Sequence, residues 1–223
     1  WLDFGECFFT ATSVDLSVLT RVGKVWSVGV NMPVRNESAL KFMLERRSIS
    51  HKILAAPAPN RAELEVILTA GARIPDHKML EPFRFIVLED AALDRLAEAV
   101  HARALEMDMD LEKAEKARFS FANAPISIAV VASIKQNELV PEVEQTLAVG
   151  ACCASVLNAA LASGWGANWI TGWVAFDVPF LIEHLQLSED EYIAGFIHIG
   201  TSRSEPLERK RPDLNAITTW VTI

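Results

Sequence analysis

The chain has 223 residues, of which 51% are hydrophobic, and its formal net charge is −8. This length fits one globular domain with a large apolar core. The negative charge argues against nucleic-acid binding, which needs a basic face that displaces counterions, and against attraction to anionic membrane surfaces. No uninterrupted apolar run is long enough to span a membrane. We therefore expect a cytoplasmic protein that binds neither nucleic acid nor membranes.

Three cysteines are present, and two of them, Cys152 and Cys153, are adjacent. Adjacent positions on a helix point in different directions and rarely form a disulfide. No spacing of cysteine and histidine in the sequence matches a zinc site. We interpret Cys152 and Cys153 as small core residues of a protein from a reducing compartment, and we expect no metal.

Residues 1–31 differ from the rest of the chain. They have no basic segment before an apolar run and no cleavage site, so they do not resemble a signal peptide. Met32 then opens the segment MPVRNESALKFMLERRS, which reads like the start of a natural protein. We expect residues 1–31 to be a non-native or disordered extension and residues 32–223 to form the domain. The alternative is an N-terminal arm that packs on the domain.

The first predicted elements are two helices. Asn36 can cap a helix with one apolar face that ends near Arg46. A loop follows, and Asn60 with Glu63 then forms a capping box at the start of a second helix. Pro75 stops this second helix because proline cannot continue the hydrogen-bond ladder.

The middle of the chain alternates between strands and helices. Residues 83–88 (FRFIVL) and 126–132 (ISIAVVA) are rich in branched and aromatic residues, so both are predicted to be buried strands. Residues 91–116 are predicted to form one helix with many exposed charges. Residues 142–163 are predicted to form a long helix with few charges that is buried on most sides, and a second copy of the chain would supply the missing cover.

The last predicted elements complete a layered domain. Residues 168–173 (NWITGW) form a short strand or turn, Asp177 caps a short helix, and residues 192–200 (YIAGFIHIG) form a strand. The tail that begins at Ser202 is expected to wrap over a surface. Buried strands flanked by helices predict a layered domain of the α/β or α+β class.

Several familiar catalytic and cofactor motifs are missing from the sequence. It contains no GxGxxG after a strand, no GxxxxGK[ST] phosphate loop, no GxSxG nucleophile turn and no HExxH zinc motif. What remains are three polar clusters, each at the end of an apolar element.

The first cluster is Arg46, Arg47 and Ser48. Adjacent arginines on a helix project about 100° apart, so they can hold different parts of one ligand. Guanidinium groups always carry charge and bind phosphate through two hydrogen bonds. The alternative is that these cations only stabilise the end of a helix through its dipole.

The second and third clusters are residues 71–78 (GARIPDHK) and residues 169–172 (WITG). The second concentrates ionisable residues in a loop that proline terminates, and it could equally be a solvated loop. In the third, threonine can donate a hydrogen bond and glycine lets a flat ring approach the backbone. Its alternative is a strand that ends in a tight turn.

Taken together, these clusters resemble the short subgroup of the bacterial nitroreductase family. Members carry RRS near the start, PDHK after the second helix and W-x-[ST]-G after the long helix. The chain has Arg46-Arg47-Ser48, Pro75-Asp76-His77-Lys78 and Trp169-Ile170-Thr171-Gly172 in the same order. The resemblance covers residues 32–223 and includes the late segment GFIHIGT.

The resemblance implies an α+β, three-layer fold with a central, mostly antiparallel sheet flanked by helices, in a domain-interlocked homodimer. It also implies a non-covalent FMN at each of two sites at the subunit interface, with NAD(P)H as co-substrate. Three regions and the tail would contact the cofactor. The three regions are Arg46, Arg47 and Ser48, then Arg73 and His77 of the partner, and then Trp169, Ile170, Thr171 and Gly172. In the tail the expected contact is Arg211, with Arg209 as the second choice.

The function that follows from the resemblance is an FMN-dependent oxidoreductase. It would transfer electrons from NAD(P)H to a small oxidised acceptor, such as a nitroaromatic or a quinone, by a ping-pong mechanism. The flavin carries the chemistry, so no side chain is expected to act as a nucleophile. Three alternatives remain open: a flavin enzyme of the same fold that removes halogens or reduces enones, a flavin-binding or dimeric protein without turnover, and a helical interaction domain without a cofactor.

Overall fold

The computed structural model describes residues 34–222. The predicted N-terminal extension, residues 1–31, lies outside the described residues. Contacts between residues divide the chain into residues 1–37 and residues 38–223, and the second unit holds the folded domain. Its helices are α1 (Glu37–Glu45), α2 (Arg61–Gly71), α3 (Asp90–Glu106), α4 (Leu111–Ala122), α5 (Glu142–Ala162), α6 (Val178–Leu185) and α7 (Leu214–Ile217). Its strands are β1 (Leu54–Ala55), β2 (Phe83–Glu89), β3 (Ile126–Ala132), β4 (Gly166–Ile170) and β5 (Tyr192–Ser202), and its short 3₁₀ turns are η2 (His51–Ile53), η3 (His77–Met79) and η4 (Trp173–Phe176).

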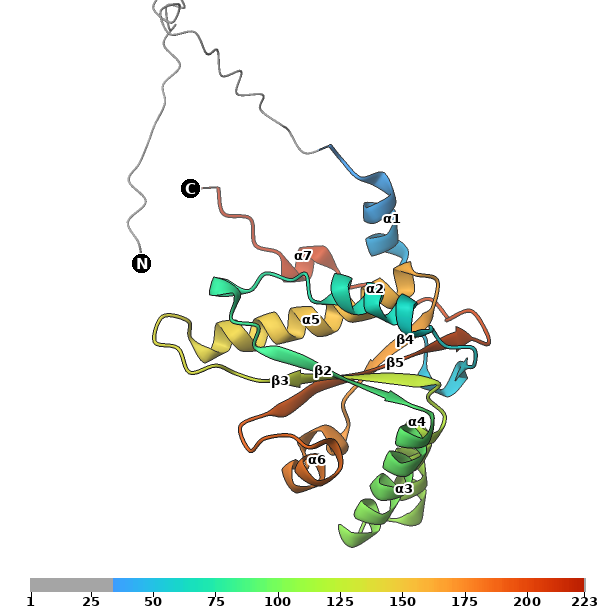
Figure 1. Ribbon diagram of the computed structural model, residues 1–223. Coiled ribbons are helices and arrows are strands. Elements are labelled where there is room, and N and C mark those ends of the chain that lie inside the picture. Colours follow the sequence, from blue (N-terminus) through green and yellow to red (C-terminus); the bar gives the residue numbers. More distant parts are fainter. Residues whose placement is uncertain (1–33, 223) are drawn as a thin grey trace, which may run out of the picture. The chain divides into compact units, whose positions relative to one another are not determined.

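The five strands form one antiparallel sheet in the order β1-β5-β3-β2, and β4 also pairs with β5 (Figure 1). Strand β5 has 11 residues, which is long enough to pair with β3 through Tyr192–Ile199, with β4 through Phe196–Gly200 and with β1 through Thr201 and Ser202. Every residue of β3 is buried, as the sequence predicted. Strand β2 lies at the edge and is mostly half-buried, so the prediction that it is fully buried was wrong.

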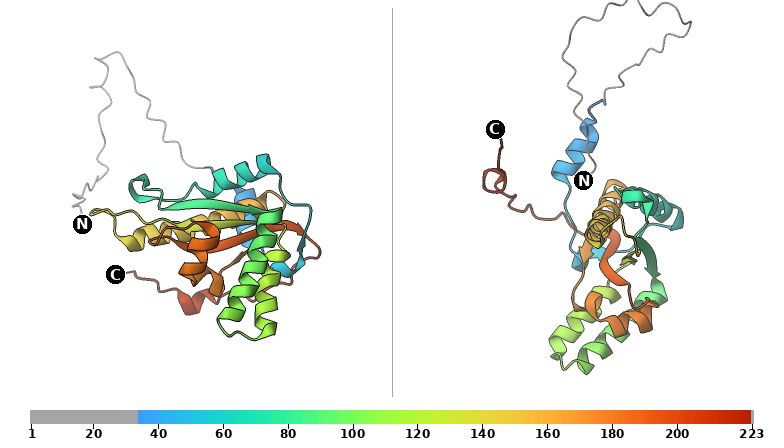
Figure 2. Two further views of the ribbon diagram at one scale, coloured as in Figure 1. Left: turned by 60° about the horizontal axis from the view of Figure 1, so that its bottom comes forward. Right: turned by 90° about the vertical axis from the view of Figure 1, so that its left-hand side faces the viewer.

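Helices cover both faces of the sheet, which confirms the three-layer α+β fold. Figures 1 and 2 show α2 and α5 on one face and α3, α4 and α6 on the other. Each face has its own cluster of buried apolar side chains, and alternate residues of β3 serve the two clusters: Ile128 packs toward α2 and α5, and Ala129 toward α3 and α6. Each large apolar side chain that is fully buried in these layers contributes about 1.5–3 kcal/mol to folding.

Helix α5 is long because few residues in its sequence would end a helix. Its buried side forms the core of one layer. Val149, Cys153 and Val156 pack against α2 and the sheet. Cys152 and Cys153 are free and buried, as predicted, and burial raises the pKa of each thiol to about 12. By length and composition alone, α5 could also cross a membrane, a test that the core helix of a soluble protein can pass as well.

The side of α5 that faces away from the sheet is exposed, so the prediction that this helix is buried on most sides was wrong for the single chain. Val143 and Leu147 are more than half exposed in the single chain. The tail also departs from its prediction, because residues 203–222 do not wrap over the surface of their own chain and are almost all exposed. Leu207 and Trp220 lie in this tail with 89% and 84% of their surface accessible.

The region predicted as one helix, residues 91–116, is a pair of helices, α3 and α4. The break has a local cause: Asp110 accepts a hydrogen bond from the backbone N–H of Lys113 and so caps the start of α4. Such a cap stabilises a new helix start by about 1 kcal/mol. The two helices pack against each other beside the sheet (Figure 1).

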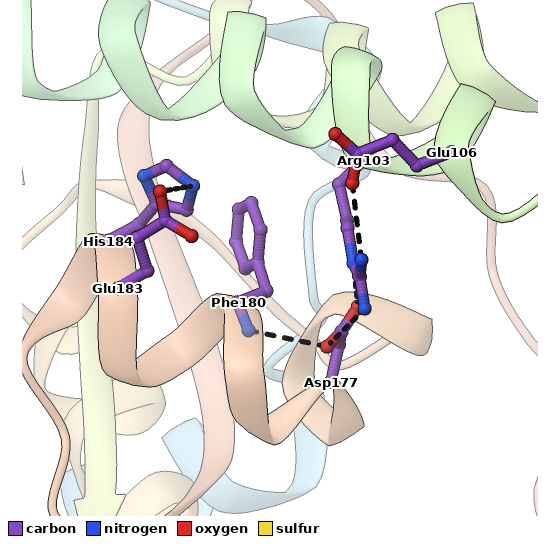
Figure 3. A network of polar contacts seen from close by, with 6 residues as sticks. All are labelled: Arg103, Glu106, Asp177, Phe180, Glu183 and His184. Carbon is purple, nitrogen blue, oxygen red and sulfur yellow. Dashed lines mark hydrogen bonds and ion pairs between the residues drawn. The ribbon is translucent and has the colours of Figure 1, made fainter.

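An ion pair connects α3 to the start of α6. Asp177 accepts hydrogen bonds from Arg103 Nε at 2.7 Å and from the backbone N–H of Phe180 at 3.3 Å, as Figure 3 shows. Asp177 thus caps α6, as predicted, and also joins it to α3. This pair fixes the end of η4, whose first residue, Trp173, packs against the core.

Candidate functional site

A polar pocket of about 610 Å³ brings the first predicted cluster together with the tail. Arg46, Arg47 and Ser48 follow the end of α1 and line one side of it. Arg209 and Arg211 reach it from the tail. We call it the arginine pocket. The structure therefore places together four of the predicted cofactor-binding residues, Arg46, Arg47, Ser48 and Arg211, along with the second-choice Arg209.

The electrostatics of the arginine pocket favour an anion. Burial lowers the pKa of Arg46, and the charges of Arg211 and Arg47 lower it further. Arg46 donates one hydrogen bond, from Nη2 to Ser48 Oγ at 3.0 Å, but its buried Nε has no partner among residues 34–222. A buried donor without a partner costs about 1–3 kcal/mol, so an acceptor atom placed here would be stabilising.

Glu208 is the carboxylate that these cations contact in the single chain. Arg47 Nη1 lies 3.1 Å from Glu208 Oε1, and Arg211 Nη2 lies 3.2 Å from the same oxygen. The Arg47 contact is an ion pair without hydrogen-bond geometry, because Arg47 Nη1 has no hydrogen-bond partner among the residues that the structure describes. Glu208 is mostly exposed, and its pKa is lowered, first by the backbone N–H of Arg209 and then by Arg47. A phosphate would offer the same guanidiniums more acceptor oxygens than this one carboxylate.

Strand β4 holds the arginine segment in place through hydrogen bonds near Ile49. The backbone N–H of Ile49 donates to the carbonyl of Ala167 at 2.8 Å, and Asn168 Nδ2 donates to the carbonyl of Ile49 at 2.8 Å. Asn168 also lines the arginine pocket. The sequence analysis did not select Asn168, although a polar amide in an otherwise apolar strand was the available sign.

The third cluster lies at the end of β4, where its residues divide between the two faces of the sheet. Ile170, Thr171 and Gly172 line a second, mainly apolar pocket of about 360 Å³, and Gly172 has a φ of +69°, which glycine adopts without strain. Trp169 lies on the opposite face. Its indole packs over Gly195, and its Nε1–H donates a hydrogen bond to the carbonyl of Ala194 at 3.2 Å. In the single chain, Trp169 therefore points away from both pockets.

The second cluster lies apart from the arginine pocket. His77 Nδ1 contacts Glu144 Oε2 of α5 at 2.8 Å and lines a surface pocket beside that helix. Arg73 is exposed just after α2. Both residues belong to the layer of α2 and α5, whereas Asn168 and Ile170 face the layer of α3 and α4, so one chain does not bring the two sets together.

A row of three polar side chains, two of them buried, crosses the sheet next to these pockets. Ser127, His198 and Asn168 are aligned on β3, β5 and β4. Ser127 Oγ and both ring nitrogens of His198 are buried without hydrogen-bond partners among the described residues. His198 is therefore a fully buried imidazole whose two ring nitrogens make no hydrogen bond within residues 34–222. Its ring packs on Phe121, with 5.7 Å between ring centroids, and lies 6.3 Å from that of His51.

An α+β, three-layer domain with a cluster of guanidiniums at the end of its first helix defines a class of protein that can hold a phosphate-bearing ligand. Comparisons with known proteins agree with this class. The model of the Nitroreductase family matches residues 43–201.

Two curated proteins are similar in sequence. A protein of Escherichia coli K12, provisionally named NAD(P)H nitroreductase YdjA, is 36% identical over 163 residues, which cover 73% of this chain and 87% of that protein. A Haemophilus influenzae protein, provisionally named NAD(P)H nitroreductase, is 37% identical over 174 residues, which cover 77% of this chain and 92% of that protein.

Solved structures share the fold. A nitroreductase-like family protein from Bacillus cereus superposes with a TM-score of 0.71 at 20% identity, covering 85% of this chain and 98% of its own. A provisionally named nitroreductase from Desulfovibrio desulfuricans, solved in complex with FMN, superposes with a TM-score of 0.65 at 22% identity, covering 85% of this chain and 99% of its own. The chain belongs to the nitroreductase family.

Proposed function

We propose that this protein is an oxidoreductase that uses FMN to transfer electrons from NAD(P)H to a small oxidised acceptor. Its curated relatives carry NAD(P)H nitroreductase in their names, and the Desulfovibrio structure contains FMN. The observation in this chain that carries the proposal is the arginine pocket, with an unpartnered buried donor on Arg46.

The residues of the arginine pocket fit the phosphate of FMN. Arg46, Arg47 and Arg211 supply charge-assisted donors, and their mutual repulsion is relieved when a dianion lies between them. Ser48 adds a hydroxyl beside Arg46. Glu208 gives up its contacts with Arg47 and Arg211 when the phosphate enters, because an exposed carboxylate is easily hydrated.

The ring of FMN fits against the turn formed by Ile170, Thr171 and Gly172. This turn follows β4 directly, and Asn168 on the same strand lines the arginine pocket, so a ligand can run from one to the other. FMN, when bound, supplies the hydride chemistry. The chain would orient FMN through the arginine pocket and this turn, and NAD(P)H and the acceptor would bind at the same site in turn, which would give ping-pong kinetics.

The complete site is shared by two chains of a homodimer. In one chain, Leu44 of α1, Leu147 of α5 and Trp220 of the tail are all more than half exposed. Exposed apolar surfaces of this kind mark interfaces between proteins, and a second copy of the chain would cover these side chains. In this dimer, Arg73 and His77 of one chain reach the flavin of the other, which explains why a single chain holds them apart.

The visible spectrum of the purified full-length protein tests the function. After reconstitution with FMN and removal of unbound ligand, a flavin spectrum should remain, and anaerobic NADH or NADPH should bleach it. Addition of a nitroaromatic or a quinone should restore the spectrum. A colourless protein that retains no FMN, or bound FMN that neither nicotinamide reduces, would contradict the proposal.

A further inference from the structure

The apolar pocket beside the Ile170–Gly172 turn has the walls of a site for a flat ring. It measures about 360 Å³ and lies between α4 and η4. Phe121 and Trp173 contribute aromatic surfaces, and Met109, Ile170 and Val174 add aliphatic ones. Pockets of this size and apolarity are typical of small-molecule sites. We call it the aromatic pocket.

This pocket is separate from the arginine pocket, although the two are neighbours. Ser50, Ile53 and Asn168 line the arginine pocket, whereas His51 and Ile170 line the aromatic pocket. The turn η2 and strand β4 thus contribute residues to both pockets, one of which is strongly polar and the other apolar. A ligand of the aromatic pocket would contact the same Ile170–Gly172 turn to which we assign the flavin ring.

The charged side chains that line the aromatic pocket are all basic. Lys113 and Lys116 project from α4 and carry the charge, the imidazole of His51 lies beside them on η2, and none of the described residues that line the pocket is a carboxylate. Burial lowers the pKa of His51, and the positive charges of Lys52 and Lys116 lower it further. The entrance of the aromatic pocket is therefore positively charged, whereas the chain as a whole has a net charge of −8.

The carboxylates on α4 and at its start pair with one of these lysines, Lys113, and leave Lys116 without an ion pair in the described part of the chain. Asp110 caps the helix and lies 2.8 Å from Lys113 Nζ, but it does not line the pocket. Glu115 pairs with Arg118 and His101. Lys116 makes no ion pair in the described part of the chain. An anion at the mouth would therefore meet Lys116 directly, whereas it would share the ammonium of Lys113 with Asp110.

We propose that the aromatic pocket binds a small aromatic acid, with its ring against Phe121 and Trp173 and its carboxylate at Lys113 and Lys116. Binding of the acid follows from this pocket alone. Its role as the electron acceptor, an oxidised aromatic ring that carries an acidic group, rests on the proposed function. A neutral ring would fill the same walls but would gain nothing from the two ammonium groups.

The test compares 4-nitrobenzoate with 4-nitrobenzamide, which share the ring and the nitro group and differ in charge. Calorimetry measures the dissociation constant of each ligand for the full-length protein, with and without FMN. We expect the acid to bind about three- to ten-fold more tightly, the range that one or two exposed ion pairs supply. This preference should disappear at about 1 M salt, where the screening length is only ~3 Å.

Two variants locate the charges that cause the preference. The double substitution Lys113→Gln with Lys116→Gln should bring the acid-to-amide preference close to one. Arg95→Gln is the matched control: it removes one positive charge from an exposed position on α3 that does not line the pocket, and the preference should persist. Thermal melting verifies that each variant is folded, and the salt series on the unchanged protein tests the same charges without any substitution.

The outcomes separate this proposal from the proposed function. Equal dissociation constants for acid and amide, or a preference that survives the double substitution, would overturn the aromatic acid as ligand even if FMN binds and is reduced. A protein that fails to retain FMN but prefers the acid would overturn the oxidoreductase and keep the pocket. Steady-state kinetics of the FMN-loaded protein then compares kcat/KM for the two acceptors, and a higher value for the amide would remove the acid as the acceptor.

Discussion

Arg46 combines three properties that rarely occur together at one residue. It is half-buried, its neighbours Arg47 and Arg211 carry the same charge, and its Nε has no partner within residues 34–222. Each property is unfavourable in the empty chain, and each becomes favourable when an anion occupies the pocket. The sequence predicted Arg46, Arg47 and Ser48 as a unit because they are contiguous, but the approach of Arg211 depends on the path of the tail and came only from the family resemblance.

Replacement of Arg46 tests this interpretation directly. Arg46→Ala should weaken FMN binding by about 1.5–3 kcal/mol, the range for a hydrogen bond to a charged group. Fluorescence titration of the apoprotein with FMN measures the change. Arg61→Ala is the control, because Arg61 is a fully solvated arginine of α2 that pairs only with Glu65. Unchanged FMN affinity in Arg46→Ala would remove Arg46 from the site.

His198 makes the stability of the fold depend on pH. Burial lowers its pKa to about 3 from the ordinary 6.5, with a smaller effect of the nearby His51. Below pH 6.5 the unfolded chain takes up a proton that the folded chain cannot accept until about pH 3. The contribution of His198 is therefore complete above pH 6.5 and declines as the pH falls toward 3. Glu191, whose pKa Arg84 holds at about 2, loses its contribution only below about pH 4.5, so between these two groups only His198 changes stability from pH 6.5 to 4.5.

Urea unfolding at two pH values measures this effect. Between pH 7 and pH 5, the free energy of unfolding should fall by about 2 kcal/mol on account of His198, at ~1.4 kcal/mol per pH unit below 6.5. The variant His198→Leu, which is close in size, should lose correspondingly less over the same interval. An equal loss in both proteins would show that His198 does not titrate in this way.

At the scale of elements, local chemistry made most helices and strands predictable. The capping box of Asn60 and Glu63 and the cap at Asp177 were both predicted and are both present. The break between α3 and α4 was missed because no glycine or proline marks it, and Asp110 alone gave the sign. The edge position of β2 could not be predicted, since composition records how apolar a strand is but not how many neighbours it has.

Asp177 shows how one side chain can stabilise two elements at once. Its carboxylate caps α6 and pairs with Arg103 of α3, which lowers the pKa of Asp177. Asp177→Ala should reduce the free energy of unfolding by about 1 kcal/mol through the lost cap, and further through the lost ion pair with the partly exposed Arg103. Asp177→Asn keeps an acceptor for the cap and should cost less. Chemical denaturation compares the three proteins, and an equal cost for both variants would assign the whole effect to the ion pair.

At the scale of the molecule, the sequence predicted the three layers of the fold, but one chain does not bring all the predicted site residues together. The three-layer arrangement follows from buried strands between amphipathic helices. The positions of Arg73 and His77 relative to the flavin do not follow from one chain, because those residues lie in the layer of α2 and α5, on the other face of the sheet from Asn168 and Ile170. The exposed apolar side chains of α1, α5 and the tail are the physical reason to expect a second chain there.

A mixing experiment tests whether two chains share each site. Arg46→Ala and Arg73→Ala are expected to be nearly inactive alone at a limiting FMN concentration. In a mixed dimer, one site receives both substitutions and the other receives neither. Equal mixing makes about half of the dimers mixed, each with one intact site of two, so activity should return to about one quarter of the unsubstituted protein. Mixing each variant with itself is the control. If subunit exchange is verified by mass and activity still does not return, then Arg73 and Arg46 act within the same chain or Arg73 takes no part, and the shared site is wrong.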